Sequence, residues 1–155
     1  MQPSASAGGD DSSPVQDTET LLRRFPSDPG QLEKDLKTPR FAIFVPSPTD
    51  VDGLSLNREG PLFVRDPEAL LILAKNENIR IYGGVIAVLT GNVRARSMTV
   101  DPDPGDTPGH VIIPELNRTE YDSSRDGKRR VQDLAIRLAS EAAKVRVYPK
   151  PKPAK

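Results

Sequence analysis

The amino-acid sequence predicts an α+β fold, a single compact domain in which a small mixed sheet is covered by two main helices. Three observations predict it: short segments rich in β-branched and aromatic residues, one long amphipathic stripe near the C-terminus, and frequent proline. The 16 prolines and 11 glycines are 27 of the 155 residues, and they divide the chain into short elements. Leu, Ile, Val and Phe supply 38 residues, above the roughly 20% below which chains are usually disordered.

Two low-complexity segments flank the predicted domain. Residues 1–18 are rich in Ser, Gly, Pro and Asp, with Val15 as the only strong hydrophobe, so we expect a disordered acidic tail. Residues 149–155 alternate proline with lysine, which favours an extended polyproline II tail. The α+β domain is therefore expected at residues 19–148.

The first half of the domain is predicted to contain two short helices and two strands. Residues 18–25 fit a short helix that ends at a proline, and residues 27–36 fit a turn followed by a second short helix. Residues 40–45 lie between two prolines and are rich in aromatic and β-branched side chains, which is typical of a buried strand. Residues 54–56 alternate apolar and polar side chains, as a short strand does.

In the middle of the chain, a helix is expected at residues 66–75, which begin with Asp, Pro and Glu. The aspartate can cap the helix, the proline suits the first helical position, and the glutamate interacts favourably with the positive end of the helix dipole. Residues 79–89 have the composition of strand, with two glycines in the middle. Residues 90–96 fit either a hairpin turn into another strand or a short helix that leads to a strand at 98–100. The basic residues near the end of this segment favour the helix.

The last third of the chain contains the longest regular pattern. Strands are expected at residues 110–113, after a proline-rich loop, and at the edge of the sheet at residues 145–148. Residues 124–143 predict a long helix, because apolar residues recur there at helical spacing. The recurring residues are Val131, Leu134, Ala135, Leu138 and Ala142.

The composition also excludes several functional classes. Without cysteine, the chain has no disulfide scaffold, thiolate metal site or cysteine nucleophile. The 22 basic and 22 acidic residues cancel, so the basic footprint of a dedicated nucleic-acid binder is missing. The first residues lack the features of a secretory signal, and the longest apolar run is far below the roughly 20 residues that cross a bilayer. We therefore expect a cytoplasmic protein with no membrane association, no cofactor and no metal.

Three segments carry a resemblance to known proteins. They are Leu21-Leu22-Arg23-Arg24-Phe25-Pro26, Asp52-Gly53-Leu54-Ser55-Leu56-Asn57-Arg58, and the stretch from Asp101-Pro102-Asp103-Pro104 to Pro108-Gly109-His110-Val111-Ile112-Ile113-Pro114. Together they resemble a group of small uncharacterised bacterial proteins with an L-x-R-R opening, a central D-G-L-S segment and a late P-x-H-x-x-I-P strand. The likeness spans residues 21–114 and departs from the pattern in an insert at 31–38. It implies an intracellular single domain of bacterial or phage-related origin, and it assigns no activity and no functional residue.

A first candidate site is built around the only histidine. His110 lies where a rigid loop meets a strand, and histidine is the residue type most often used for proton transfer at neutral pH. Four arginines lie near the ends of predicted elements, and guanidinium groups suit phosphate or carboxylate binding: Arg23, Arg24, Arg40 and Arg58. If Arg24, Arg40, Ser55 and His110 converged, the site would suit a nucleotide-like anion. The plainer interpretation is a strand-capping histidine and ordinary surface arginines.

A second candidate site is the cluster of Arg125, Lys128, Arg129 and Arg130 at the start of the last predicted helix. Positive charge at this end opposes the helix dipole, so the cluster is more notable than its size. It fits an acidic partner or nucleic acid, although few aromatic residues lie nearby to stack on bases. The plainer interpretation is a solvated helix face, partly balanced by neighbouring aspartates.

The sequence contains no complete catalytic or nucleotide-binding motif. We therefore favour a small intracellular bacterial protein that binds or regulates a protein partner over an enzyme. Two alternatives stay open. One is an enzyme for a phosphorylated or nucleotide-like substrate, with His110 as acid or base and arginines holding the anion. The other is weak nucleic-acid binding through residues 125–130.

Overall fold

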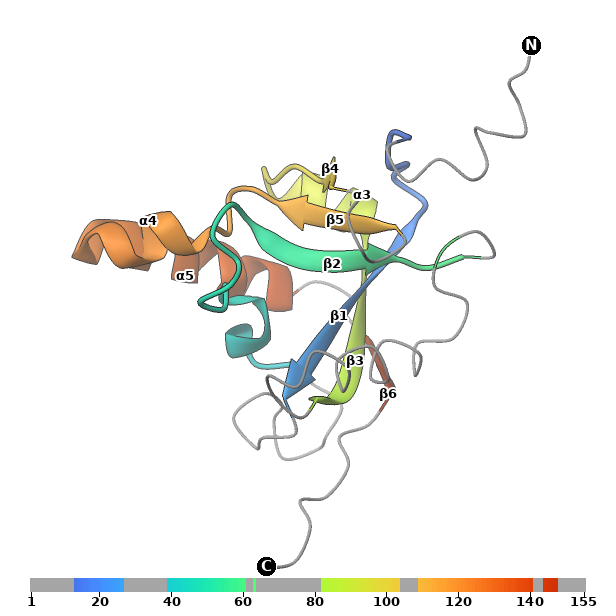
Figure 1. The fold of residues 1–155 in the computed structure, drawn as a ribbon, viewed down its shortest axis with the longest axis horizontal. Helices are drawn as coiled ribbons and strands as arrows, with labels where there is room; N and C mark the ends of the chain where they lie inside the picture. Colours follow the sequence, from blue (N-terminus) through green and yellow to red (C-terminus); the bar gives the residue numbers. More distant parts are fainter. Residues whose placement is uncertain are drawn as a thin grey trace, which may run out of the picture.

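The computed structural model describes residues 13–26, 39–60, 63, 82–103, 109–140 and 144–147. Its elements are β1 (Thr20–Pro26), η2 (Phe41–Phe44), β2 (Leu54–Arg58), β3 (Tyr82–Leu89), α3 (Thr90–Ala95), β4 (Asp101–Pro102), β5 (His110–Ile113), α4 (Arg118–Ser123), α5 (Arg125–Ala139) and β6 (Lys144–Val147). Figure 1 shows the sheet in the centre and α4 beside α5 at one end of the molecule. The predicted α+β class is confirmed. No helix among the described residues is long and apolar enough to cross a membrane.

The described strands form one sheet with the order β4-β5-β2-β1-β3-β6. Every neighbouring pair among them is antiparallel, so the expected mixed sheet is corrected to an antiparallel one. Alternating hydrophobicity identifies a strand without fixing its direction, which is why the prediction missed this. The strands expected at 54–56, 110–113 and 145–148 are confirmed within a residue or two, and so is the part of 79–89 that is described. The strand expected at 98–100 lies slightly later, at β4.

The expected helix at residues 18–25 is wrong, because this segment is the central strand β1. Leu21 pairs with Arg58 of β2 on one side and with Val88 of β3 on the other. Leu21 and Phe25 are buried in the core cluster, and Leu22 is buried on the opposite face. Apolar residues on both faces give no strict alternation, so the segment was mistaken for a helical stripe.

The expected strand at residues 40–45 is also wrong. Residues 41–44 form the short 3-10 helix η2, in which the Ile43 N–H donates to the Arg40 carbonyl oxygen. Ile43 and Phe44 are fully buried and η2 packs against α5. The aromatic and branched side chains of this segment therefore fill the core and pair with no strand. The helices predicted at 27–36 and 66–75 lie outside the described residues.

Three helical segments follow β3. Residues 90–95 form α3, which confirms the favoured alternative for that segment. The short helix α4 was not predicted, because its six residues are mostly polar and form no apolar stripe. The long helix α5 is confirmed, with Ser124 as its N-cap, although it ends at Ala139. The Ser124 hydroxyl accepts a hydrogen bond from the Gly127 N–H at 2.9 Å, which is the usual bond of an N-cap serine.

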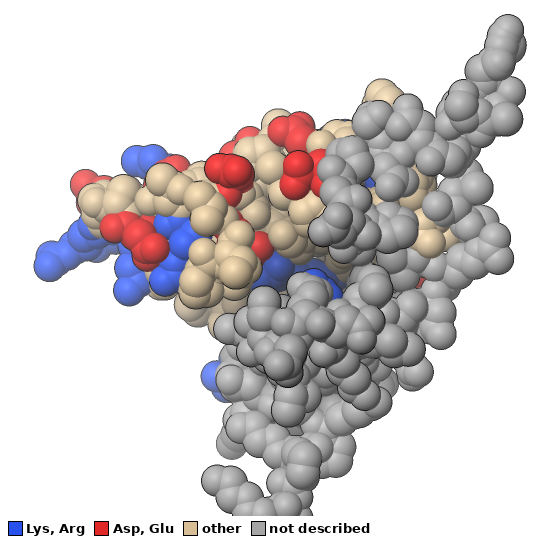
Figure 2. All heavy atoms as spheres, in the orientation of Figure 1, with Lys and Arg blue, Asp and Glu red and all other residues tan. Residues whose placement is uncertain are grey.

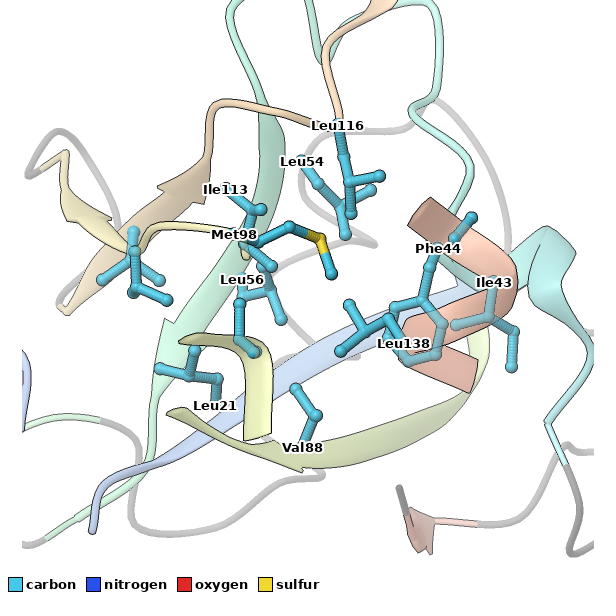
Figure 3. Close-up of a cluster of buried hydrophobic side chains, with 14 of the residues drawn as sticks. Leu21, Ile43, Phe44, Leu54, Leu56, Val88, Met98, Ile113, Leu116 and Leu138 are labelled. Carbon is cyan, nitrogen blue, oxygen red and sulfur yellow. The ribbon is translucent and has the colours of Figure 1, made fainter. Parts of the chain in front are cut away.

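The core lies between one face of the sheet and the layer formed by α5 and η2. Figure 3 shows Leu21, Leu56 and Val88 of the strands facing Leu138 of α5 and Phe44 of η2. The same cluster contains Val15, which is only 3% exposed. The expected disordered tail at 1–18 is therefore corrected for residues 13–18, where one buried valine and the contacts described below hold the segment on the sheet.

Candidate functional site

Arg58, one of the predicted anion-binding residues, is buried, and its guanidinium bonds to other residues of the protein. It is 3% exposed, and its Nε and Nη2 donate to the two carboxylate oxygens of Glu19 at 2.7 and 2.8 Å. It also donates to the carbonyl oxygens of Ser13 and Pro14. Its guanidinium lies 4.4 Å from the centre of the Phe63 ring. The structure therefore uses Arg58 to hold residues 13–19 against the end of β2.

The ion pair with Arg58 lowers the pKa of the Glu19 carboxyl group. Burial alone would raise the pKa of Glu19. The hydrogen bonds from Arg58 and from the Gln16 N–H, together with the positive charges of Arg58 and Arg94, outweigh burial and hold the pKa below its usual value of 4.5. Glu19 is therefore charged at neutral pH and stabilises the buried guanidinium.

Arg23, another of the arginines considered for anion binding, is also held inside the protein. Arg23 of β1 donates to the carbonyl oxygens of Ile43 and Ser55 at 2.6 and 2.9 Å, and Nη2 lies 3.4 Å from Asp50 Oδ2. Asp50 is only 4% exposed, and it also accepts a hydrogen bond from the Ser47 N–H. Arg23 thus fixes η2 and the loop after it to the sheet. No local signal distinguishes it from its neighbour Arg24.

The strand register brings His110 and Ser55 to one face of the sheet. His110 of β5 is opposite Asn57 of β2, and Ser55 is two residues further along the same strand, opposite Ile112. His110 is partly buried, and its Nδ1 lies 2.8 Å from the Asp103 carbonyl oxygen and 3.3 Å from Asp103 Oδ2. Because a carbonyl oxygen only accepts, Nδ1 carries the hydrogen, and in the neutral ring Nε2 keeps the lone pair.

The four residues that were predicted to converge on an anion do not lie on one face of the sheet. They are Arg24, Arg40, Ser55 and His110. Arg24 pairs in register with Val85 of β3 and is half-buried, on the face opposite to Arg23. Arg40 is exposed and leads into η2, which packs on the α5 side. The structure therefore places His110, Ser55 and Arg24 on one face, with Arg40 next to the other.

The basic cluster of the last helix forms a surface. Figure 2 shows Lys and Arg side chains gathered at the end of the molecule where Figure 1 places α4 and α5. Arg125, Lys128, Arg129 and Arg130 are all exposed. Arg130 forms an ion pair with Glu120 of α4, whereas Arg125 and Arg129 have no ion-pair partner in the part of the chain that the structure describes.

Helical geometry arranges the outward side of α5 as one stripe, which we call the α5 stripe and define as Arg125, Arg129, Gln132 and Ile136. These residues are separated by four, three and four positions, so they follow one line along the helix. Ile136 is 47% exposed although it is a large apolar residue. It lies away from Val131, Ala135 and Leu138, which face the core.

The helix α4, which packs against α5, is bonded to the loop that precedes β2. The Arg118 N–H donates to the Asp50 carbonyl oxygen, and the Thr119 hydroxyl donates to the Val51 carbonyl oxygen at 3.0 Å. The Tyr121 ring of α4 lies 4.7 Å from the Arg118 guanidinium and 5.5 Å from the Lys128 ammonium. Lys128 is thus held by a cation–π contact, and α5 is presented on a supported surface.

Comparison with protein-family models, curated proteins and solved structures finds no match to this chain. The candidate sites therefore stand on the geometry of this molecule alone.

Proposed function

We propose that this protein is a binding protein that docks an acidic segment of a protein partner on the outward side of α5. One observation carries the proposal: Arg125 and Arg129 are exposed on a supported helix, without an ion-pair partner among the described residues. The resemblance in the sequence and the absence of cysteine support a bacterial, cytoplasmic setting for this interaction.

The position of the two arginines supports a role outside folding. Arg125 lies in the first turn of α5, where the helix dipole is positive and a cation costs about 0.3–1 kcal/mol of helix stability at low salt, and Arg129 lies one turn further along. Arginines that only solubilised the helix would be better placed in its last turn, as Arg137 is. Carboxylates of a partner would neutralise the two arginine charges and would also interact favourably with the positive end of the helix dipole.

A protein partner is favoured over nucleic acid by the composition of the α5 stripe. Ile136 is an exposed apolar residue in line with the arginines, and apolar surface gains nothing against a phosphate backbone. Arg118 and Lys128 both lie against the Tyr121 ring, so cations already occupy the aromatic surface that a base would need.

A matched pair of charge reversals on α5 tests the proposal. Arg129→Glu and Arg137→Glu change the net charge equally, at exposed positions of one helix without an ion-pair partner among the described residues. The probe is a fluorescein-labelled 16-residue peptide rich in glutamate and leucine, titrated by fluorescence anisotropy in 50 mM NaCl. We expect Arg129→Glu to weaken binding at least fivefold and Arg137→Glu less than twofold. Equal effects of the two changes, or tighter binding of a 20-base-pair DNA duplex than of the peptide, would overturn the proposal.

A second candidate function, catalysis on a phosphorylated or nucleotide-like substrate, is supported by His110. Its Nδ1 is fixed by Asp103, which leaves Nε2 as a base on the sheet face that also carries Ser55 and Arg24. Phosphorus NMR of nucleoside di- and triphosphates and of a phosphoserine peptide, incubated with the protein and with His110→Asn, tests it. Turnover lost in the variant supports this function, and the absence of any turnover ends it.

A further inference from the structure

The α5 stripe has the spacing of a helix–helix seam. Its four residues are separated by four, three and four positions, which is the alternation that knobs-into-holes packing uses. At a rise of about 1.5 Å per residue, Arg129, Gln132 and Ile136 lie about 6, 10 and 16 Å along the helix from Arg125. A partner must present its groups at these intervals.

The side chains of the stripe change from basic to apolar along the helix. The two arginines occupy its first two turns, and Ile136 occupies the end nearer the C-terminus of α5. The nearest acids on the helix, Asp126 and Asp133, lie to one side of the line. A partner therefore needs carboxylates at one end of its contact and an apolar side chain at the other, in that order.

The interval to the apolar residue distinguishes between partner conformations. In an extended peptide, side chains on one side recur about every 6.8 Å, at about 7, 14 and 20 Å, so none of them lies opposite Ile136 when one faces Arg125. In a second α-helix, residues i, i+4, i+7 and i+11 recur at the same intervals as the stripe itself. A helix therefore meets Arg125 and Ile136 in register, whereas an extended segment meets them together only with an offset of about 2–4 Å along the helix axis.

We infer that the partner segment is an amphipathic helix that packs along α5, with two carboxylates four residues apart and an apolar residue seven positions from the nearer one. This inference rests on the proposed function and names the class of its partner. Contact along a single 15-residue helix is smaller than a standard stable interface, so the complex is transient and sensitive to salt.

Two peptides of identical composition test the inference. The patterned peptide places Glu at positions 2 and 6 and Leu at positions 9 and 13 of a 16-residue helix-forming sequence, and the scrambled peptide has the same residues without this spacing. Binding is measured by fluorescence anisotropy in 50 mM NaCl, and helix formation by circular dichroism. We expect the patterned peptide to bind at least tenfold more tightly and to gain helicity on binding.

Variants of the full chain connect this preference to Ile136. Ile136→Ser removes the apolar end of the stripe, and Val51→Ser is the matched control, because Val51 is 51% exposed and lies outside α5. We expect Ile136→Ser to bring the two peptides within twofold of each other and Val51→Ser to leave the tenfold preference intact. Circular dichroism spectra and melting curves verify that both variants are folded.

The outcomes separate this inference from the proposed function. If both peptides bind equally and Arg129→Glu weakens both, the acidic partner stands and the helical one is overturned. If neither peptide binds, or if a 20-base-pair DNA duplex binds more tightly than either, the proposed function fails and the inference fails with it.

Discussion

Replacing Glu19 with glutamine removes the negative charge that faces the buried guanidinium of Arg58. The Arg58 side chain is 3% exposed and that of Glu19 is 18% exposed. The substitution keeps the size of the side chain, and it removes the charge together with one of the two acceptor oxygens that face the guanidinium. Arg58 keeps its bonds to the carbonyl oxygens of Ser13 and Pro14.

The expected cost follows from burial. Removing one partner of a buried ion pair typically costs about 3–5 kcal/mol, and we expect about 3 kcal/mol here, because two carbonyl oxygens still face Arg58. Asp17→Asn is the matched control. Asp17 lies 2.6 Å from Arg94 Nη1, but the two side chains are 71% and 37% exposed, so breaking this pair should cost less than about 1 kcal/mol.

The cost depends on pH in a defined direction. Because the pKa of Glu19 is lowered in the folded protein, the carboxylate stabilises the fold fully above its unfolded value of 4.5. This contribution is lost as the pH falls through the folded pKa, where Glu19 takes up a proton and resembles glutamine. The difference in unfolding free energy between the natural protein and Glu19→Gln should therefore shrink below pH 4.5.

Urea unfolding followed by far-ultraviolet circular dichroism measures these differences, since the chain has no tryptophan to serve as a fluorescence probe. Titrations at pH 7 and pH 3 for both variants complete the comparison. A Glu19→Gln cost at pH 7 no larger than that of Asp17→Asn would refute the reasoning, and so would a cost that is the same at both pH values.

Three further substitutions test the packing of the fold by urea or thermal unfolding. Gly84→Ala should destabilise by at least about 2 kcal/mol, because a Cβ atom there would overlap the Phe25 ring, and an unchanged stability would contradict the β1–β3 register. Ser124→Ala should cost about 1 kcal/mol through loss of the bond to the Gly127 N–H, and no effect would mean that the cap is dispensable. Leu138→Ala should cost about 2–5 kcal/mol, because the side chain is fully buried under the sheet, and a smaller loss would place α5 outside the core.

How well each element could be predicted depends on how much of its environment is local. The helix α5 follows from its own residues, because one face is buried and the other is solvated, which gives the 3.6-residue period directly. The strands β2 and β5 were also predicted from local signals, β2 from short apolar alternation and β5 from a run of β-branched residues between a proline-rich loop and Pro114. For β1 and η2 this signal fails, since β1 is buried on both faces and the apolar residues of η2 fill a core made by other segments.

The internal arginines could not be predicted at all. Arg58 meets Glu19 across 39 residues of sequence, and Arg23 meets the carbonyl oxygens of Ile43 and Ser55 across 20 and 32 residues. No local pattern connects such partners. As a result, both arginines were interpreted as candidates for anion binding, although they hold loops to the sheet.

The two candidate sites differ in how much of their geometry is encoded locally in the sequence. A site assembled from several strands, such as the expected convergence of Arg24, Arg40, Ser55 and His110, depends on a register that the sequence does not contain. The α5 stripe depends only on helical spacing, and the structure keeps every one of its residues on one line. The same local rule that makes α5 predictable also makes its outward face predictable, because residues that avoid the core at helical intervals must share the opposite side. Arg125, Arg129 and Ile136 are exposed, so these positions can be selected for binding a partner without cost to the core of the described domain.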